Sequence, residues 1–430
     1  MRKQKILFAI FFIIILVVNF SYCQNNGKKS IDGSNQSMDL NNNFSWIINW
    51  DNVSWRVGAV VTDTLENAYC MGVIDLSPLG YIAPPNIVSI FILKINSSGF
   101  IIWTKKFNYT YFYIDLEIDS DNNIYSLWYI NFEKYLLLKL DSSGNLLWNY
   151  TVEGYFYEIY IDNYKNIHLL GYEYQQEGLL RLLKLNESGN MEYNFSISFD
   201  FEPQCFRVDD LNNSYIASYS YEDHLMGLYK VNSSGGLNLV KELDQSPDYR
   251  HLLFDYHGNL YVFGEYNSFS NVLFKYNVSG DRIFISNWKS YIPMVHLSRW
   301  HEIAVDSLGN IFCAGLSEFY TLTAFSEIFL VKYSQNGTLL GDYLWTKYRD
   351  MVSLSDVHTD HQNNLYFVGS SEKGSFIVKN PSLVDYLIKI FDFYLDEETL
   401  STLVTVSIFF GVWSLLGISL YIYYFKKGKR

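Results

Sequence analysis

A short phrase recurs seven times along this chain: an apolar run, an aspartate, three further residues, an asparagine, and a second apolar run. Successive copies are 56, 43, 47, 46, 51 and 54 residues apart, which is far too long for a coiled coil and typical of four-stranded propeller blades. The repeat therefore predicts an all-β fold of seven similar units. The seven aspartates are Asp63, Asp119, Asp162, Asp209, Asp255, Asp306 and Asp360.

The first half of each repeat reads as a tight hairpin. An aspartate carboxylate can accept hydrogen bonds from nearby backbone N–H groups in an Asx-turn. The residue before the repeat asparagine is Asn or Gly in five of the seven copies, which suits a hairpin position with positive φ. The seven aspartates are therefore interpreted as structural residues and not as acid–base catalysts.

The second half of each repeat contains a lysine between apolar residues, then usually an Asx-x-x-Gly turn, then a strand that often reaches a tryptophan. The clearest copy is Leu138-Lys139-Leu140-Asp141-Ser142-Ser143-Gly144-Asn145-Leu146-Leu147-Trp148. An Asx residue at the first position and Gly at the fourth indicate a type I turn. With period-2 alternation the lysine points away from its apolar neighbours, so a solvated strand face is the expected environment.

Four strands per repeat can be counted in six copies, but the seventh ends early at Asn380-Pro381. An outer-strand pattern is found instead near the start of the chain, at residues 43–50. We therefore expect a seven-bladed β-propeller over residues 43–381, closed by an N-terminal outer strand. Such closure protects a sheet edge that would otherwise be open to aggregation.

The phrase Asp255-Tyr256-His257-Gly258-Asn259-Leu260-Tyr261-Val262, together with residues 138–148, resembles the SBBP-type β-propeller repeat. The resemblance covers roughly residues 43–380. It implies the propeller fold and an exported or cell-surface protein of prokaryotic type. It implies little about a ligand, because the family is defined by its scaffold.

The two ends of the chain carry targeting signals. Residues 1–23 have a basic start, an apolar core and small residues before Gln24, and they read as a signal peptide followed by a polar linker at 24–42. Residues 400–425 form an uncharged stretch long enough for a C-terminal transmembrane α-helix, and the basic tail 426–430 follows it. Residues 382–399 show helical spacing, which predicts an amphipathic juxtamembrane helix. The positive-inside rule places the propeller outside the cell membrane as a single-pass type I protein.

Between the signal and the tail, residues 24–425 carry 25 basic and 45 acidic residues, a net charge of −20. This balance argues against nucleic acid and anionic lipid as partners. Among twelve Asn-x-Ser/Thr sequons, four are retained as candidate glycosylation sites: Asn52, Asn108, Asn149 and Asn194. Beyond the signal, Cys70, Cys205 and Cys313 lack metal-ligand spacing and are interpreted as buried thiols.

Binding is expected on the loops opposite the short, uniform turns, because variable loops on a rigid scaffold commonly hold binding sites. Insertions lie at residues 75–89, 286–301 and 316–327. Aromatic rings next to polar groups in such loops can stack on sugars or anchor a protein. An alternative is that the tryptophans are packed against the propeller. The candidate ligand-binding residues are Tyr81, Trp288, Tyr291, Trp300 and His301.

Catalytic motifs are absent from the sequence: no Gly-x-Ser-x-Gly, His-Glu-x-x-His or P-loop phrase occurs. The phrase Asp119-Ser120-Asp121 mimics the start of a calcium loop but lacks its later Gly and Glu. We therefore expect no cofactor, no metal and no catalytic residue. The favoured function is binding or adhesion to an extracellular protein or glycan. The alternatives are an ectoenzyme acting on surface polysaccharide and a structural component of the cell coat.

Overall fold

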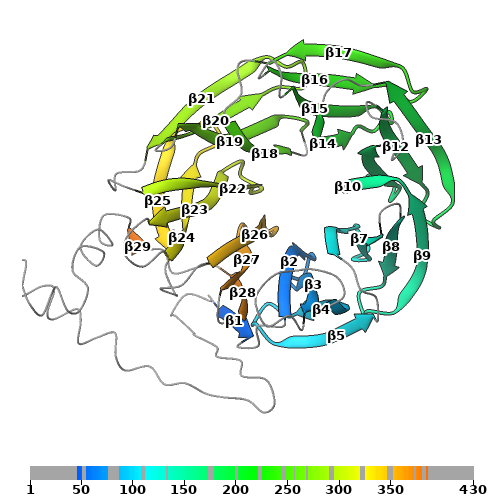
Figure 1. Cartoon of the computed structure of the whole chain (residues 1–430), viewed down its shortest axis with the longest axis horizontal. Helices are drawn as coiled ribbons and strands as arrows, with labels where there is room; N and C mark the ends of the chain where they lie inside the picture. The colour runs from blue at the N-terminus through cyan, green and yellow to red at the C-terminus, as the bar shows by residue number, and fades with distance from the viewer. Residues whose placement is uncertain are drawn as a thin grey trace, which may run out of the picture. The chain divides into compact units, whose positions relative to one another are not determined.

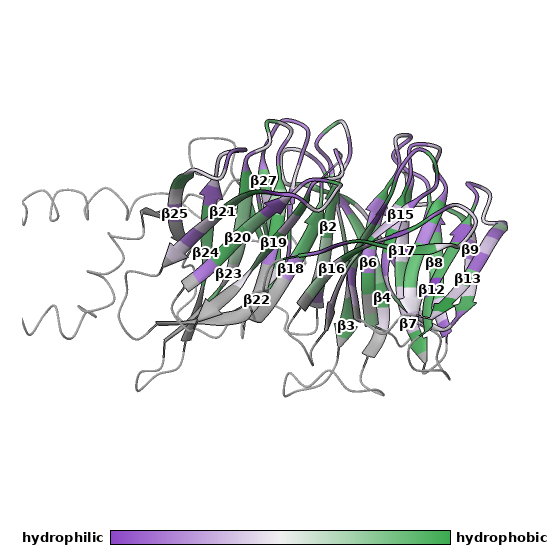
Figure 2. Cartoon of the chain, turned by 90° about the horizontal axis from the view of Figure 1, so that it is seen from above, coloured by the Kyte–Doolittle hydropathy of each residue, from purple (hydrophilic) through white to green (hydrophobic). Residues whose placement is uncertain are grey.

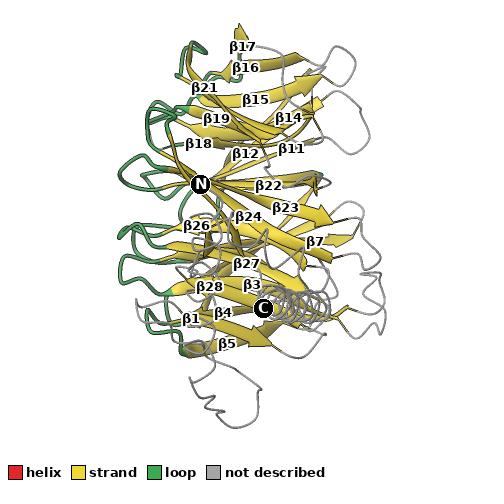
Figure 3. Ribbon diagram, turned by 90° about the vertical axis from the view of Figure 1, so that its left-hand side faces the viewer, coloured by secondary structure: helices red, strands yellow, loops and turns green. Residues whose placement is uncertain are grey.

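The computed structural model describes the chain in sixteen ranges: residues 46–50, 55–75, 87–107, 112–131, 134–172, 179–198, 202–220, 225–243, 248–255, 257–267, 270–289, 295–319, 325–345, 352–371, 374–379 and 384–385. Within these ranges there are strands and loops but no helix, as Figure 3 shows. Consequently, no helix in the described part is long and apolar enough to cross a bilayer.

The described strands form seven antiparallel sheets, and the fold is an all-β seven-bladed propeller (Figure 1). This confirms the fold class predicted from the repeat. The chain divides into two compact units: unit 1 comprises Met1–Asp200 and Ser355–Pro381, and unit 2 comprises Phe201–Leu354 and Ser382–Arg430. Each unit is described by itself below.

Unit 1 contains blades 1, 2 and 3 and blade 7 from Ser355 onward, and the strands of each blade are given from inner to outer. Blade 1 is β2 (Trp55–Thr62), β3 (Ala68–Asp75), β4 (Ile87–Ile95) and β5 (Ile101–Phe107). Blade 2 is β6 (Phe112–Ile118), β7 (Ile124–Asn131), β8 (Lys134–Leu140) and β9 (Leu146–Glu153). Blade 3 is β10 (Tyr155–Ile161), β11 (Ile167–Tyr172), β12 (Leu179–Leu185) and β13 (Met191–Ser198). Blade 7 is β26 (Val352–Thr359), β27 (Leu365–Ser371), β28 (Gly374–Lys379) and β1 (Trp46–Trp50).

Unit 2 contains blades 4, 5 and 6. Blade 4 is β14 (Glu202–Val208), β15 (Ser214–Ser220), β16 (Leu225–Val231) and β17 (Leu237–Glu242). Blade 5 is β18 (Asp248–Phe254), β19 (Leu260–Asn267), β20 (Ser270–Tyr276) and β21 (Arg282–Lys289). Blade 6 is β22 (Val295–Val305), β23 (Ile311–Phe319), β24 (Phe325–Tyr333) and β25 (Leu339–Trp345), with a fifth strand, β29 (Val384–Asp385), on its outer edge.

Blade 7 is completed by the N-terminal strand, as the sequence predicts. β1 pairs antiparallel with β28, from Trp46 opposite Lys379 to Trp50 opposite Ser375. The Trp46 side chain is 1% exposed, and its indole donates a hydrogen bond to the Ser97 carbonyl of blade 1. The closing strand is therefore held both by its own sheet and by the next blade.

The repeat aspartate organises the hairpin between the inner and second strands of every blade. In blade 2, Oδ1 of Asp119 accepts hydrogen bonds from the N–H groups of Asp121 and Asn123, both at 2.9 Å. Oδ2 accepts from the Asn123 amide at 2.8 Å and from the Tyr125 hydroxyl at 3.0 Å. The carboxylate thus fixes the turn and the start of the following strand, which confirms its structural role. The residue three positions after each repeat aspartate has positive φ, as expected for this turn.

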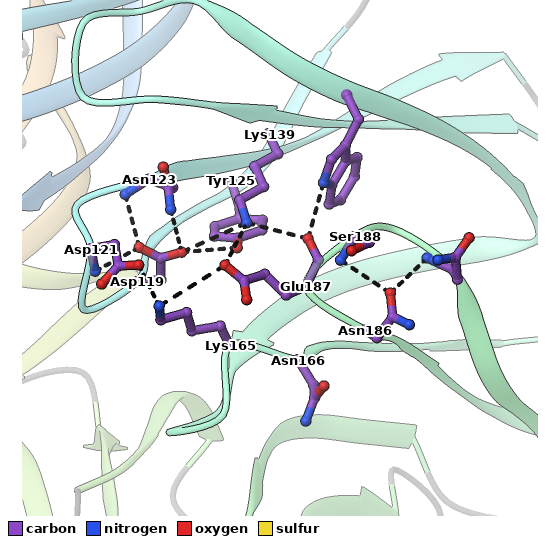
Figure 4. Close-up of polar contacts among 12 residues, drawn as sticks. Asp119, Asp121, Asn123, Tyr125, Lys139, Lys165, Asn166, Asn186, Glu187 and Ser188 are labelled. Carbon is purple, nitrogen blue, oxygen red and sulfur yellow. Dashed lines mark hydrogen bonds and ion pairs between the residues drawn. The ribbon is translucent and has the colours of Figure 1, made fainter.

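The recurrent lysines do not lie on a solvated face, so that expectation is wrong. Lys139, Lys184 and Lys379 are 3%, 6% and 3% exposed. In blade 2, Lys139 lies over the Tyr125 ring and 3.9 Å from the Asp119 carboxylate, as Figure 4 shows. The lysine does point away from its apolar neighbours, but neighbouring blades cover a central strand on both faces. The prediction from period-2 alternation assumed that one face of the strand is open to solvent, whereas here both faces are covered.

The outer-strand tryptophans Trp103 and Trp148 of unit 1 contact a turn of the next blade. The indole of Trp103 donates to the Ser142 carbonyl at 3.3 Å, and the indole of Trp148 donates to the Glu187 carbonyl at 3.1 Å. Each ring also covers the positive-φ glycine of the same turn, Gly144 or Gly189. The type I turn and the tryptophan of the repeat are therefore two halves of one contact between blades.

Apolar side chains fill the spaces between successive blades in each unit, and many strand residues are accordingly green in Figure 2, interspersed with hydrophilic ones in purple. Cys70, Cys205 and Cys313 are free and buried, as predicted. Burial raises the pKa of the Cys70 and Cys313 thiols well above the usual range, which keeps them unreactive.

After β28, the structure describes one further short strand, β29. β29 pairs with β25, placing Val384 opposite Leu344 and Asp385 opposite Tyr343. A helix was expected over residues 382–399, and at 384–385 the structure has this strand instead. The rest of that helix, the signal peptide, the linker 24–42, the transmembrane helix and the basic tail lie outside the described residues.

Candidate binding site on the inner strands

The structure places Trp288 in a core and not on a surface. Its side chain is 2% exposed, it stacks on Phe329 with ring centroids 4.9 Å apart, and its indole donates to the Asp342 carboxylate at 3.0 Å. These contacts account for both the ring and its N–H group. Trp288 is therefore not available to stack on a ligand in this arrangement.

Of the other four predicted ligand-binding residues, the structure describes the backbone of two, and the proposed grouping stays a prediction. Trp300 and His301 lie in β22, where His301 is in register with Gly315 of β23. Tyr81 and Tyr291 lie outside the described residues. Parts of the three predicted insertions are strand, since β21 extends to Lys289 and β23 extends to Phe319.

Two of the candidate glycosylation sites can be located. Asn149 is exposed on the outer strand β9, and Asn194 is exposed on β13, where its Oδ1 accepts a hydrogen bond from Arg181. Asn52 and Asn108 lie outside the described residues. Glycosylation of these four asparagines stays a prediction.

No group of three or more metal-ligating side chains was found in the described ranges. In the phrase that mimics a calcium loop, the Asp119 carboxylate is occupied by its own turn. Asp121 pairs instead with Lys165 of the next blade (Figure 4). The polar groups of this phrase are thus used within the fold.

Ionisable side chains recur at one other place, four residues before the repeat aspartate, on the inner strand of each blade. The residues at this position, from blade 1 to blade 7, are Ala59, Asp115, Glu158, Cys205, His251, Glu302 and Asp356. In blades 1 to 4 a register shift between the inner and second strands falls immediately before it. Such bulges re-aim a side chain and are frequent next to functional sites.

In unit 1 the carboxylates at this position link neighbouring inner strands. Oδ2 of Asp356 on β26 accepts a hydrogen bond from the Val60 N–H group of β2 at 2.8 Å. Oδ2 of Asp115 on β6 accepts in the same way from Ile159 of β10 at 3.0 Å. The second oxygen of each binds the next N–H group of its own strand, at Val357 and Leu116. A carboxylate can accept about four hydrogen bonds, so each keeps acceptor capacity for a ligand.

Glu117, two residues beyond Asp115 on β6, adds a third carboxyl group. Asp115, Glu117 and Asp356 are all partly exposed, yet crowding by the inner strands removes much of their hydration. This loss of hydration raises the pKa of Asp115 and of Asp356 to about 7. Loss of hydration and repulsion from Asp115 raise the pKa of Glu117 to about 8. The three groups, which we call the inner-strand carboxyls, are thus partly protonated at neutral pH.

A neutral histidine lies on the same strand as Asp356. Nε2 of His358 is 3.0 Å from the Thr62 hydroxyl of β2. Burial lowers the pKa of His358 to about 4, against the attraction of Asp360. In unit 2, Nδ1 of His251 is 3.1 Å from a Glu302 carboxylate oxygen. Loss of hydration lowers the pKa of His251 to about 4.

Sequence reasoning missed the inner-strand carboxyls because it looked for motifs within one segment. The signal lay in the alignment of the repeats: a position inside an apolar strand carries Asp, Glu or His in five of seven copies. An unexplained charge at a strand position next to a fixed hairpin could have identified Asp115 and Asp356. Their proximity comes from blades that are far apart in the sequence.

No model of a known protein family matches the chain, and no curated protein matches it. Among solved structures, the β-propeller domain of the Trilobed protease from Pyrococcus furiosus is similar, with 8% identity and a TM-score of 0.50 over 78% of this chain and 96% of that one. Virginiamycin B lyase from Staphylococcus aureus, in a catalytically inactive form with quinupristin, aligns at 12% identity and a TM-score of 0.49 over 78% and 98%.

The Pan2 WD40 domain from Neurospora crassa aligns at 7% identity and a TM-score of 0.46 over 78% of this chain and 92% of that one. At such identities the likeness shows the fold alone. The chain is therefore a β-propeller, a class that serves varied functions and is compatible with a binding module.

Proposed function

We propose that this chain is a membrane-anchored extracellular propeller that binds a protein or glycan partner, with the inner-strand carboxyls as its recognition groups. The anchor is the uncharged stretch at 400–425, and the exported location rests on the signal-like residues 1–23. The SBBP resemblance, which supports a cell-surface role, rests on the repeat motif.

The observation that carries the proposal is the contrast between two sets of carboxylates. Each repeat aspartate is committed to its own hairpin, as at Asp119. Asp115 and Asp356 keep acceptor capacity and lie on the inner strands β6 and β26, which both contact β2. Burying such groups costs free energy, and that cost is commonly retained where it serves function.

The protonation of these groups favours a glycan over other partners. A carboxyl group with a pKa near 7 is present in both forms at neutral pH, donating a hydrogen bond when protonated and accepting when ionised. Sugar hydroxyls also donate and accept. A mixed set of carboxyls therefore matches a hydroxyl-rich ligand without needing a charged one.

A glycan array probed with the purified full-length protein in nanodiscs tests this proposal. The variant Asp115→Asn/Glu117→Gln/Asp356→Asn should lose binding to the glycans that the parent retains. Asp141→Asn is the matched control, because its carboxylate lies in an exposed turn of the same unit. Equal binding by parent and triple variant, or no binding by either, would refute the assignment.

An ectoenzyme acting on surface polysaccharide is a second candidate, and one observation favours it. A carboxyl group with a raised pKa, such as Glu117, can act as a general acid near neutral pH. Incubation of the protein with a glycan that it binds should then release reducing ends, and Glu117→Gln should abolish the release. Binding without release supports the binding module instead.

A further inference from the structure

The turns between the third and outer strands hold many of the N-glycosylation motifs of the chain. In the described part, six of the seven blades have such a turn, and each turn contains five residues. Together these 30 residues hold five of the twelve Asn-x-Ser/Thr sequons that follow the signal-like residues 1–23. The five asparagines, which we call the turn asparagines, are Asn96, Asn186, Asn232, Asn277 and Asn336.

The chemistry of the turn explains an oxygen at its first position but does not require an asparagine there. In blades 1, 3, 4 and 5, Oδ1 of the turn asparagine accepts hydrogen bonds from the N–H groups two and four positions further on, at 2.8–3.1 Å. In blade 2, Oδ1 of Asp141 accepts the same two hydrogen bonds. An aspartate therefore builds this turn as well as an asparagine does.

The turn of blade 6 keeps a sequon although it has lost the asparagine at the first position. That position is Ser334, and the sequon lies two residues further on as Asn336-Gly337-Thr338. The position of Asn336 is serine in the other five turns, so the turn does not require an asparagine there. The Thr338 hydroxyl donates a hydrogen bond to Oδ1 of Asn336 at 2.9 Å. A shared modification explains both placements of the sequon, whereas turn chemistry explains only the first.

The amide nitrogen, which is the atom that carries an N-linked glycan, is available in these turns. None of the described residues accepts a hydrogen bond from Nδ2 of Asn96, Asn186 or Asn232, since these side chains are held through Oδ1. Figure 4 shows the two bonds to Oδ1 of Asn186. By contrast, Nδ2 of the hairpin residue Asn123 donates to the Asp119 carboxylate at 2.8 Å. In the turns of blades 1, 3, 4 and 5, the two residues after the turn asparagine are exposed, so a transferase and a glycan have access.

From these observations we propose that the five turn asparagines are N-glycosylated. The inference rests on the exported location proposed above and is independent of any glycan that the protein binds. The donor is a glycan linked to a polyprenyl phosphate, and a transferase of the exporting cell catalyses the reaction. Nδ2 bonds to the anomeric carbon and loses one proton, while the bond from that carbon to the phosphate oxygen breaks and the polyprenyl phosphate leaves with the electron pair. Because Oδ1 takes no part, each turn keeps its hydrogen bonds.

Glycopeptide mass spectrometry of the full-length protein, purified from the membranes of the cells that make it, tests the inference. Each turn asparagine should carry one glycan. Asn232→Asp should lose one glycan and keep the melting temperature, because Asp141 fills the same position in blade 2. Asp141→Asn completes a sequon with Ser143 and should gain one glycan. The double variant Asp141→Asn/Ser143→Ala is its matched control and should gain none.

Protease added to intact spheroplasts separates the two ways in which the inference can fail. If the protease digests the propeller but the turn asparagines are unmodified, or only sequons elsewhere in the chain are modified, the inference is wrong and the exported location stands. If the propeller resists the protease until the cells are lysed, the exported location is wrong, and the inference falls with it. A glycan gained equally by the single and double variants at position 141 would show that the sequon is not what is recognised.

Discussion

The indole of Trp148 donates a hydrogen bond to the Glu187 carbonyl, which joins the outer strand of blade 2 to a turn of blade 3 at 3.1 Å. The Lys139 ammonium donates to the same carbonyl at 3.2 Å. One turn oxygen thus receives two donors from the preceding blade. The buried lysine and the outer-strand tryptophan of the repeat therefore hold the same turn of the next blade, which explains why both recur.

Replacing the hairpin aspartate should destabilise the fold strongly. Asp119→Ala removes four acceptor contacts and leaves Lys139 without its buried carboxylate. Lys139 keeps its contacts with the Glu187 carbonyl and carboxylate, but the turn loses its hydrogen-bond acceptor and the buried ion pair loses one partner. We expect a loss of about 3–5 kcal/mol in the free energy of unfolding, the usual cost of removing one partner from a buried, hydrogen-bonded ion pair. Urea titration of the purified protein measures it. Asp141→Asn is the control, because its turn is exposed and four other blades use Asn there, and a large loss in that variant would contradict the explanation.

The glycines of the two turn types should respond differently to asparagine. Gly189 and Gly258 both have positive φ, but a Cβ at Gly189 would come 3.2 Å from the Trp148 ring, whereas at Gly258 the nearest atom is 3.7 Å away. Gly189→Asn should therefore cost about 1–3 kcal/mol through strain and displacement of the tryptophan. Gly258→Asn should be nearly neutral, since Asn122 occupies the same turn position in blade 2. Equal melting temperatures for the two variants would show that the contact between Trp148 and Gly189 does not contribute to stability.

Stability should fall as the pH rises through neutrality. The folded-state pKa values of Asp115, Asp356 and Glu117 are raised to about 7, 7 and 8, above those of an unfolded chain. Their contribution is therefore fully present below about pH 4 and is lost as the pH rises through the folded values. Below about pH 6.5 His251 and His358, whose pKa values are lowered, act in the opposite sense, so the melting temperature of the parent should decrease between about pH 6.5 and about pH 8.5. The variant Asp115→Asn/Glu117→Gln/Asp356→Asn should show a flatter profile, and an unchanged slope would mean that these groups do not titrate as stated.

Asp162 should act in the opposite sense at low pH. Hydrogen bonds from His168 and Asn166 lower its pKa to about 2, although burial opposes this. Its contribution is present above the unfolded pKa of about 4 and is lost as the pH falls through about 2. His168→Leu removes one of these donors and should raise the pKa of Asp162. NMR titration of the carboxyl carbon measures this shift, and an unaltered pKa would show that the histidine contributes nothing.

Removing the closing tryptophan should weaken blade 7. Trp46→Ala would leave a cavity between β1, Gly99 and Tyr366, and it removes the bond to the Ser97 carbonyl. A cost of about 3–5 kcal/mol is expected for such a truncation. Limited proteolysis with N-terminal sequencing should show earlier release of the first strand. Replacing Leu65, which is 72% exposed, by alanine is the control and should leave the cleavage rate unchanged.

The fold could be predicted because the residues that form each turn lie close together in the sequence. Asp255, Gly258 and Asn259 specify one hairpin within five positions, and seven copies give the blade number. The lysine environment could not be predicted, because whether Lys139 is wet depends on the neighbouring blade. The packing of Trp288 against Phe329 and the gathering of the inner-strand carboxyls depend on such distant contacts too. The spacing of residues within one repeat carries no information about these contacts between blades.

The pairing of β1 with β28 has a consequence for how the protein is made. Blade 7 joins the first described strand to one of the last, and the Ser375 hydroxyl donates to the Trp55 carbonyl across 320 positions of the chain. During synthesis, the N-terminal strand β1 keeps an unpaired edge until β28 has been made. Such long-range pairing slows folding and leaves a sticky intermediate. We therefore expect the nascent chain to need protection from aggregation until β28 has been synthesised and blade 7 can close.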